Sequence, residues 1–165
     1  MSRKRKEGGT GALVVLIIAI LMAGRNHLPV VPHSFHPASH SVRAKAIAWA
    51  RQQEGCPYLY GGTSCGTGFD CSGLIMKAYA HAGRAIPRTS EDQWKHMHHV
   101  TVPRPGDLVF FAGSPIDPPP GHVGLVISRH KMIEAYASGY PVRVSSFGTA
   151  GSPPGDRIPT GFAAP

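Results

Sequence analysis

The 165-residue chain is poor in acidic residues, in cysteines and in the motifs that identify common ligands. Nine Asp and Glu stand against 17 Lys and Arg, yet no basic patch interleaved with aromatics and no nucleic-acid motif is present, so no nucleic-acid partner is expected. The three cysteines form no CxxC pair, and the histidines between His96 and His99 do not share one helical face. We therefore expect neither a metal nor a cofactor. No internal repeat is present, and the length suits one domain.

The first 24 residues have the layout of an export signal. Four basic residues precede Glu7, and residues 11–24 contain no charged or strongly polar side chain. This apolar run is shorter than the ~20 residues of a comfortable membrane-spanning helix. Leu21–Gly24 is a poor match to a small-x-small cleavage site. Residues 1–24 are interpreted as a signal peptide or an N-terminal membrane anchor, and an anchor would keep the basic end in the cytoplasm.

The rest of the chain is predicted to be exported, either secreted or anchored to the cell membrane and facing the cell wall. Residues 25–40 indicate a Pro- and His-rich linker, and residues 41–165 a single folded domain, which we expect to be a monomer. Without the first 24 residues, 13 basic and eight acidic residues remain. The resulting net charge of +5 suits an anionic polymer such as bacterial cell wall.

Export changes the interpretation of the cysteines, because disulfides persist in oxidising compartments. Cys56 and Cys65 lie nine positions apart and could close a small disulfide loop, which would leave Cys71 free. The alternative is that they are two unrelated buried thiols.

Hydrophobic spacing predicts helices in the first part of the domain and strands in the second. A first helix is expected around an apolar stripe from Val42 to Ala50, with Ser39 or Ser41 as its cap and Gly55 as its stop. Two more are expected over 71–81 and, shorter, from Thr89 through His98. Short β-like runs follow at 108–111, 122–128, 132–137 and 142–147. This order indicates an α+β domain, with helices packed on a small antiparallel sheet. Ile158 and Phe162 are the expected docking points of the Pro- and Gly-rich tail.

Two motifs place a thiol and an imidazole in settings that suit nucleophilic catalysis. A thiol attacks a carbonyl as the thiolate, and an ordinary cysteine, with a pKa of about 8.5, is mostly protonated at neutral pH. Cys71 lies in the motif FDCSGL (69–74), at the start of a predicted helix whose amides and dipole favour an anion. His122 lies in PGHVGLVI (120–127), on a predicted strand, where it could serve as the base.

In these motifs the chain resembles the NlpC family of papain-like cysteine peptidases, which cut bacterial peptidoglycan stem peptides. The resemblance covers almost all of the sequence after Ser41, and the ordered set of motifs is far more specific than any one of them. The matching blocks are YLYGG (58–62), FDCSGL (69–74), PRTS (87–90), PGDLVFF (105–111), GHVG (121–124) and MIEA (132–135).

The resemblance implies a role for four residues. Cys71 would be the nucleophile, His122 the general base, and Glu134 the third polar residue that orients the imidazole. Tyr58 would lie near the oxyanion site. The family often has His at the third position, and a Glu there should favour the imidazolium more strongly than a neutral partner.

Two further residues follow from the helix start itself. Asp70 is expected to fix the turn before the helix, and the backbone amide of Cys71 or Ser72 is a candidate oxyanion donor. By resemblance, the bond cut would join D-γ-glutamate to a diamino acid such as diaminopimelate. Two alternatives stay open: amidase or acyltransferase chemistry on the same thiol, and a non-catalytic wall-binding part of an export, phage or conjugation apparatus.

Strand parity gives an independent check on Glu134, because side chains alternate between the two faces of a sheet. A hairpin loop of odd length is required to bring Glu134 to the face of His122. A three-residue loop at 128–130 would pair Ile127 with Lys131. Glu134 would then lie one same-face step from His122, a diagonal of roughly 7 to 8 Å that long side chains can bridge.

Overall fold

The computed structural model describes residues 41–113, 120–148, 152 and 157–165. The predicted signal or anchor (1–24) and linker (25–40) lie outside the described residues. No helix in the described ranges is long and apolar enough to cross a membrane. The elements are α2 (Val42–Arg51), β1 (Thr63–Ser64), β2 (Gly68–Phe69), α3 (Cys71–His81), α4 (Ser90–His96), β3 (His98–Val100), β4 (Leu108–Phe111), β5 (His122–Ser128), β6 (Lys131–Glu134), β7 (Arg143–Ser146) and β8 (Gly161–Ala164).

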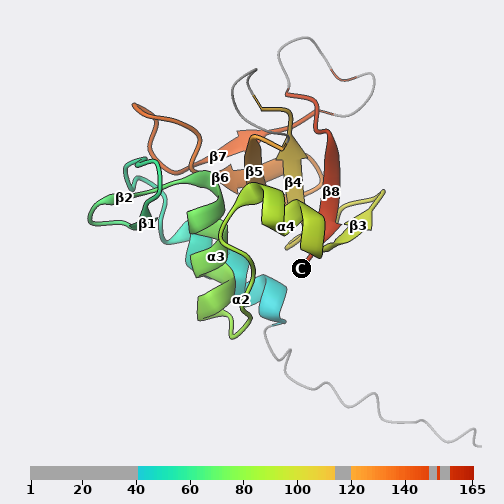
Figure 1. The fold of residues 1–165 in the computed structure, drawn as a ribbon, viewed down its shortest axis with the longest axis horizontal. Coiled ribbons are helices and arrows are strands. Elements are labelled where there is room, and N and C mark those ends of the chain that lie inside the picture. Colours follow the sequence, from blue (N-terminus) through green and yellow to red (C-terminus); the bar gives the residue numbers. More distant parts are fainter. Residues whose placement is uncertain (1–40, 114–119, 149–151, 153–156) are drawn as a thin grey trace, which may run out of the picture. The chain divides into compact units, whose positions relative to one another are not determined.

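The architecture is the predicted α+β arrangement. Strands β3 to β8 form one antiparallel sheet in the order β3-β8-β4-β5-β6-β7. Helices α2 and α3 pack together beside this sheet, and the small hairpin β1–β2 lies next to the start of α3 (Figure 1). The thiol of Cys71 therefore comes from the helical layer and the imidazole of His122 from the sheet.

Alternation along the strands gives the sheet two buried faces. One face packs against the helices and includes Leu108, Phe110, Val123 and Leu125. The opposite face carries a second apolar cluster, made of Val109, Phe111, Val126, Met132 and Phe147 with Phe162 against it. Burial of each such aliphatic or aromatic side chain stabilises the fold by about 1.5–3 kcal/mol.

The first two helices begin and end where the local sequence predicts. The Ser41 side chain accepts a hydrogen bond from the amide of Ala44, and α2 ends at Arg51, before Gly55. The Asp70 side chain caps α3 by accepting from the amide of Gly73. After α3, Gly83 has a φ of 87°, a left-handed conformation that suits glycine at a helix end.

The third predicted helix is too long by two residues. It was expected to run through His98, but α4 ends at His96 and His98–Val100 form strand β3. The reason is tertiary, because β3 pairs with β8 of the C-terminal tail, and the His99 ring stacks on Trp94 at 3.8 Å.

The C-terminal tail contributes a strand that sequence patterning did not predict. Strand β8 lies between β3 and β4 in the sheet. Phe162 docks as expected, with its ring centroid 5.8 Å from that of Phe147. Ile158 does not dock, since its side chain is 54% exposed.

The hairpin between β5 and β6 corrects the parity argument. The predicted pairing of Ile127 with Lys131 is wrong, because Ser128 pairs with Lys131 across a two-residue loop. An even loop alone would place Glu134 on the face of the sheet opposite to His122. A β-bulge between Val126 and Ser128 adds one residue to β5 and so restores the shared face. Glu134 therefore reaches the face of His122 with a different loop from the one predicted.

Close packing between α3 and the preceding loop yields the first prediction. A Cβ on Gly73 would lie 2.3 Å from the backbone oxygen of Gly62 and 2.7 Å from Asp70 Oδ1. We expect Gly73→Ala to push the loop away from the helix and to lower the free energy of unfolding by about 1–3 kcal/mol. Urea unfolding of the variant measures this loss.

Gly66→Ala is the matched control, because a Cβ there meets nothing within 4 Å. Its unfolding midpoint should stay close to that of the wild type. If Gly73→Ala were no less stable than Gly66→Ala, the close contact between α3 and the loop would be contradicted.

Candidate active site

Cys71 lies at the first residue of α3, at the edge of a groove. It is the free cysteine among the described residues, and its side chain is partly buried. The groove has a volume of about 570 Å³ and is lined on its other sides by Tyr58, Tyr60, Arg88 and Glu91, among others. Helix geometry leaves the first amides of α3 without intrahelical acceptors, so they can stabilise a negative charge near this sulfur.

The Asp70 carboxylate fixes the start of this helix by accepting hydrogen bonds from Gly73, Gly61, Arg88 and Ser72. Its Oδ1 accepts from the amide of Gly73 at 2.6 Å, and its Oδ2 accepts from the amide of Gly61 at 2.9 Å. The Arg88 guanidinium donates to both oxygens, at 3.0 and 2.6 Å. Arg88 also donates to the Ser72 hydroxyl at 3.0 Å. Asp70 thus joins the helix, the groove loop and the segment before α4.

Arg88 is a site residue to which sequence reasoning assigned no role. Its hydrogen bond to Asp70 raises its pKa above the ordinary value, although partial burial opposes this. It occurs in the PRTS block, so the position was visible in the sequence. Its partner lies 18 residues away, and spacing alone does not show which carboxylate an arginine will meet.

His122 lies at the start of β5 and is only 9% exposed. Its Nε2 donates to Glu134 Oε2 at 2.8 Å, which leaves Nδ1 for the thiol. Burial alone would lower the pKa of His122, but hydrogen bonds to Cys71 and Glu134, and attraction to their charges, raise it above its ordinary value. The arrangement therefore favours a positively charged imidazole beside the sulfur.

Glu134 is fully buried at the end of β6 and is surrounded by donors. Besides the bond from His122, its carboxylate accepts from the Ser145 hydroxyl at 2.6 Å and from the Arg157 guanidinium. Arg143 Nε lies 3.7 Å from Oε1. Burial would raise the pKa of Glu134, but the hydrogen bonds from His122, Arg157 and Ser145 lower it to about 2.

The partners of Glu134 were missed at the sequence level. Arg143 and Ser145 alternate along β7, so strand periodicity could have placed them on one face. Nothing in the sequence signals Arg157, which comes from the tail and contacts Glu134 across 23 positions.

Tyr58 and Ser72 border the groove together with Cys71. The backbone of Tyr58 forms a bridge to Phe69, which holds the segment beside the start of α3. The hydroxyl of Ser72 accepts from Arg88 and donates to Asp70 Oδ1 at 3.5 Å, so its backbone amide is the group suited to the predicted oxyanion role. Both oxyanion roles stay predictions.

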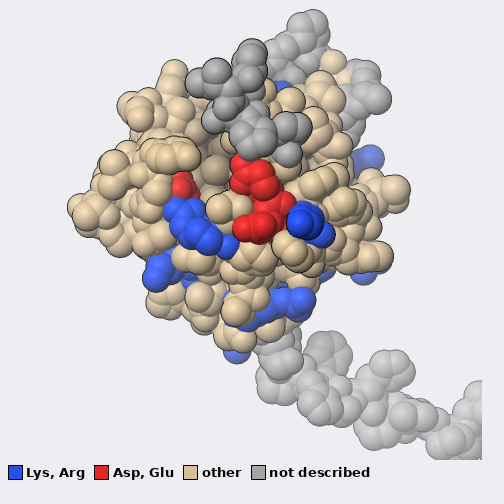
Figure 2. Space-filling model, viewed as in Figure 1, with Lys and Arg blue, Asp and Glu red and all other residues tan. Residues whose placement is uncertain are grey.

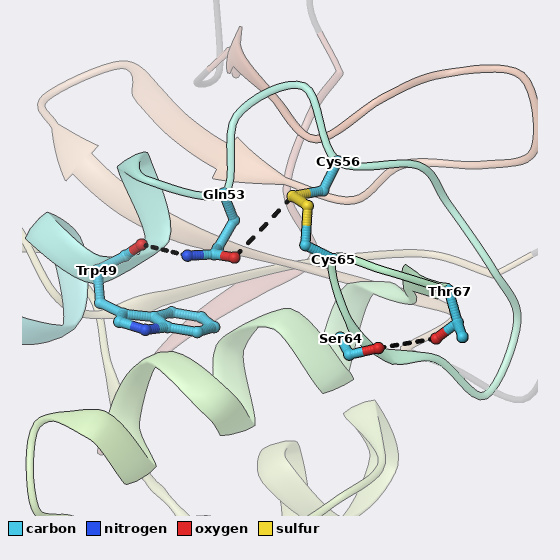
Figure 3. Close-up of a disulfide and its surroundings, with 6 residues drawn as sticks. All are labelled: Trp49, Gln53, Cys56, Ser64, Cys65 and Thr67. Carbon is cyan, nitrogen blue, oxygen red and sulfur yellow. Dashed lines mark hydrogen bonds between the residues drawn. A yellow bond between two sulfur atoms is a disulfide. The ribbon is translucent and has the colours of Figure 1, made fainter.

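Cys56 and Cys65 form a disulfide (Figure 3). Figure 3 also shows Gln53, whose Nε2 donates to the backbone oxygen of Trp49 at 3.3 Å and whose Oε1 lies 3.9 Å from Cys56 Sγ. The disulfide closes the segment that contains Tyr58 and so ties one wall of the groove to the end of α2.

Charges of both signs lie close together on the face that carries α4, where acidic side chains gather between basic ones (Figure 2). Within the described ranges, no group of three or more His, Cys, Asp or Glu residues could hold a metal ion. His96 and His99 each hydrogen-bond a nearby backbone oxygen, of Asp92 and Trp94 respectively. The thiol of Cys71 and the imidazole of His122 offer nucleophilic and acid–base chemistry.

Arg157, which donates to Glu134, yields a prediction about stability in acid. A carboxylate with a lowered pKa stabilises the fold above its ordinary pKa of 4.5, and this contribution is lost as the pH falls through about 2. Arg157→Gln removes one hydrogen bond that lowers the pKa of Glu134, so this pKa should rise toward its ordinary value and the pH-dependent contribution should shrink. Urea unfolding between about pH 5 and pH 3 should therefore show a shallower decline in stability for the variant than for the wild type, from a lower stability at neutral pH.

Arg51→Gln serves as the control, because Arg51 is half exposed and pairs only with the exposed Glu54 among the described residues. An identical pH dependence for the Arg157 and Arg51 variants would contradict the assigned role of Arg157.

Comparison with known proteins identifies the family of this chain. Residues 55–153 match the model of the NlpC/P60 family. The chain is 38% identical over 92 residues to the bifunctional muramidase/DL-endopeptidase CwlT of Bacillus subtilis, covering 54% of this chain and 28% of CwlT. It is 38% identical over 125 residues to the peptidoglycan endopeptidase RipB of Mycobacterium tuberculosis, covering 66% of this chain and 49% of RipB. It therefore spans half or less of the length of these relatives.

Solved structures show the same similarity. The structure of RipB from Mycobacterium tuberculosis aligns with a TM-score of 0.61 at 33% identity, covering 78% of this chain and 67% of that one. An NlpC/P60 family protein from Bacillus cereus aligns with a TM-score of 0.63 at 28% identity, covering 73% of this chain and 39% of that one.

Proposed function

Because this chain belongs to the NlpC/P60 family, we propose that it is a cysteine endopeptidase that hydrolyses amide bonds in peptidoglycan stem peptides. The observation that carries the proposal is the position of His122, which interacts with Cys71 on one side and donates to the buried Glu134 on the other. A nucleophile, a base and a group that orients the base are the parts that acyl transfer requires.

The proposed reaction begins with the Cys71 thiolate beside a protonated His122. The sulfur attacks the carbonyl carbon, and the oxyanion that forms is held by the first amides of α3, with Tyr58 as a further donor. His122 then gives its proton to the leaving amine as the C–N bond breaks. In the second half, the neutral imidazole takes a proton from water, the hydroxide displaces the sulfur, and the free peptide acid leaves.

We assign the scissile bond to the amide between D-γ-glutamate and a diamino acid such as diaminopimelate. This assignment is supported by the similarity to CwlT, a bifunctional muramidase/DL-endopeptidase. The disulfide supports a location in an oxidising compartment outside the cytoplasm, where peptidoglycan lies. Residues 11–24 would anchor the protein to the membrane if they are retained, and the domain would act as a monomer.

Incubation of the full chain with purified peptidoglycan tests the proposal. Mass spectrometry should detect fragments that end in D-γ-glutamate together with fragments that begin with the diamino acid. Prior treatment with iodoacetamide should abolish both. Release of intact stem peptides from the sugar strands would indicate an amidase instead, and the absence of any product would contradict hydrolase activity.

Replacing Glu134 with glutamine tests the third residue. We expect kcat/KM to fall about 100-fold rather than to zero, because the imidazole is still present but is less well oriented and less stabilised as a cation. Attraction to Glu134 contributes to the raised pKa of His122, so this pKa should fall in the variant. Since the thiolate–imidazolium pair is lost as pH rises through the His122 pKa, activity should decline at a lower pH than in the wild type.

Glu54→Gln is the control, because Glu54 is exposed and lies three residues after the end of α2. This variant should leave the pH profile unchanged. A complete loss of activity in a folded Glu134→Gln protein would show that the carboxylate does more than orient the imidazole.

A further inference from the structure

Arg143 carries a positive charge that the described residues compensate only in part. Glu134 already accepts hydrogen bonds from His122, Ser145 and Arg157, while Arg143 Nε stands 3.7 Å from it. This Nε is buried and has no hydrogen-bond partner in the described part of the chain. One carboxylate thus faces two guanidinium groups, and the Arg143 side chain is 39% exposed. Such a guanidinium can still bind an incoming carboxylate.

Two tyrosines hold this guanidinium in place. Its central carbon lies 4.7 Å from the ring centroid of Tyr140 and 5.2 Å from that of Tyr136. The two rings lie 5.6 Å apart, and both tyrosines remain partly exposed. Stacking of this kind orders the arginine before a ligand arrives, which reduces the entropic cost of binding.

Arg143, Tyr136 and Tyr140 form a cluster that lies beside the imidazole of His122. The ring of Tyr136 meets that of His122 edge-on, with centroids 5.6 Å apart at 85°. Glu134 connects His122 to Arg143, because its carboxylate accepts a hydrogen bond from His122 and lies 3.7 Å from Arg143 Nε. The groove at Cys71 is lined by Tyr58, Tyr60 and Arg88 but by none of Arg143, Tyr136 and Tyr140. The cluster of Arg143, Tyr136 and Tyr140 therefore lies next to His122 but outside the lining of this groove.

The chemistry of the reaction determines which part of the substrate lies beside His122. The imidazole protonates the leaving amine, so the residue that carries this amine must lie against His122. We propose that Arg143, held by Tyr136 and Tyr140, binds a carboxylate on the residue that leaves with the amine. This inference rests on the proposed function and adds to it a preference for a free carboxylate over a carboxamide at that residue.

Two synthetic peptides test the subsite. Both contain the D-γ-glutamyl–diamino acid bond, and they differ only in whether the diamino acid carries a free carboxylate or a carboxamide beside the scissile amide. We expect the full-length wild type to cleave the carboxylate peptide with a kcat/KM roughly 10- to 100-fold higher, the range of a charge-assisted hydrogen bond. Arg143→Gln should reduce this ratio to about one. Arg143→Lys keeps the charge but loses the bidentate donors of the guanidinium, so it should give an intermediate ratio.

The controls separate binding from folding and from chemistry. Arg129→Gln replaces an exposed arginine in the β5–β6 turn and should keep the wild-type ratio. The rate of Cys71 alkylation by iodoacetamide reports the thiol–imidazole pair without any peptide, and Arg143→Gln should change it little.

Three outcomes would overturn the inference. Equal cleavage of the two peptides by the wild type would show that the enzyme does not recognise a carboxylate at this position. A wild-type ratio retained in Arg143→Gln would show that another group reads it. Cleavage of neither peptide by a wild type whose Cys71 is alkylated normally would contradict the proposed function, and the subsite with it.

Discussion

Cys71→Ala is expected to abolish peptidoglycan hydrolysis while leaving the domain folded. The sulfur supplies the electron pair that attacks the carbonyl, and the alanine methyl group has none, so kcat/KM should fall by about 10⁴-fold or more. The fold should survive, because alanine favours helices and the cap of α3 comes from Asp70 rather than from Cys71. Unfolding in urea should differ from the wild type by less than about 1 kcal/mol.

Alkylation provides the specific check on this result. The two other cysteines are joined in the disulfide, so iodoacetamide should modify the wild type at Cys71 alone and the variant nowhere. Muropeptide products are measured in parallel by mass spectrometry. Full activity in Cys71→Ala would show that the hydrolysis comes from another group or from a contaminant, and would favour a binding role for the fold.

Asp70→Ala is expected to cause the largest loss of stability. The substitution removes the acceptor for the amides of Gly73 and Gly61 and leaves Arg88 without its carboxylate. Breaking a buried ion pair by removing one partner typically costs 3–5 kcal/mol, and the lower end, about 3 kcal/mol, applies because Arg88 is partly exposed. Activity should fall as well, since the start of α3 and the groove loop are no longer held together.

Asp92→Ala is the matched control, because Asp92 is also an acidic residue at a helix start but is exposed and bonds only to Thr89 as a side-chain partner in the described part. It should cost less than about 1 kcal/mol in urea unfolding. Equal losses in the two variants would show that the contacts of Asp70 to Gly61 and Arg88 contribute nothing to stability.

Helix starts were the most predictable features of this fold. Asp70 caps α3 through an amide three residues away, and Ser41 and Thr89 cap α2 and α4 in the same way. These interactions lie within a few residues of sequence, so residue types alone indicate them. The position of Cys71 at a helix start follows from the same local pattern.

Strand pairing was less predictable. The runs at 108–111 and 122–128 match β4 and β5. The register between β5 and β6 depends on a bulge that no residue type announces. Strand β3 pairs with β8 across more than 60 positions of sequence, and β8 also pairs with β4.

Residue types and their spacing predicted a thiol at the start of a helix, an imidazole at the start of a strand, and a domain that combines helices with an antiparallel sheet. The surroundings of Glu134 depend on tertiary packing, which brings Arg157 of the tail and Arg143 and Ser145 of β7 to the carboxylate. The physical reason is the range of the interactions. Caps and helical spacing are satisfied by near neighbours, whereas a buried charge takes its partners from whichever distant segments pack against it.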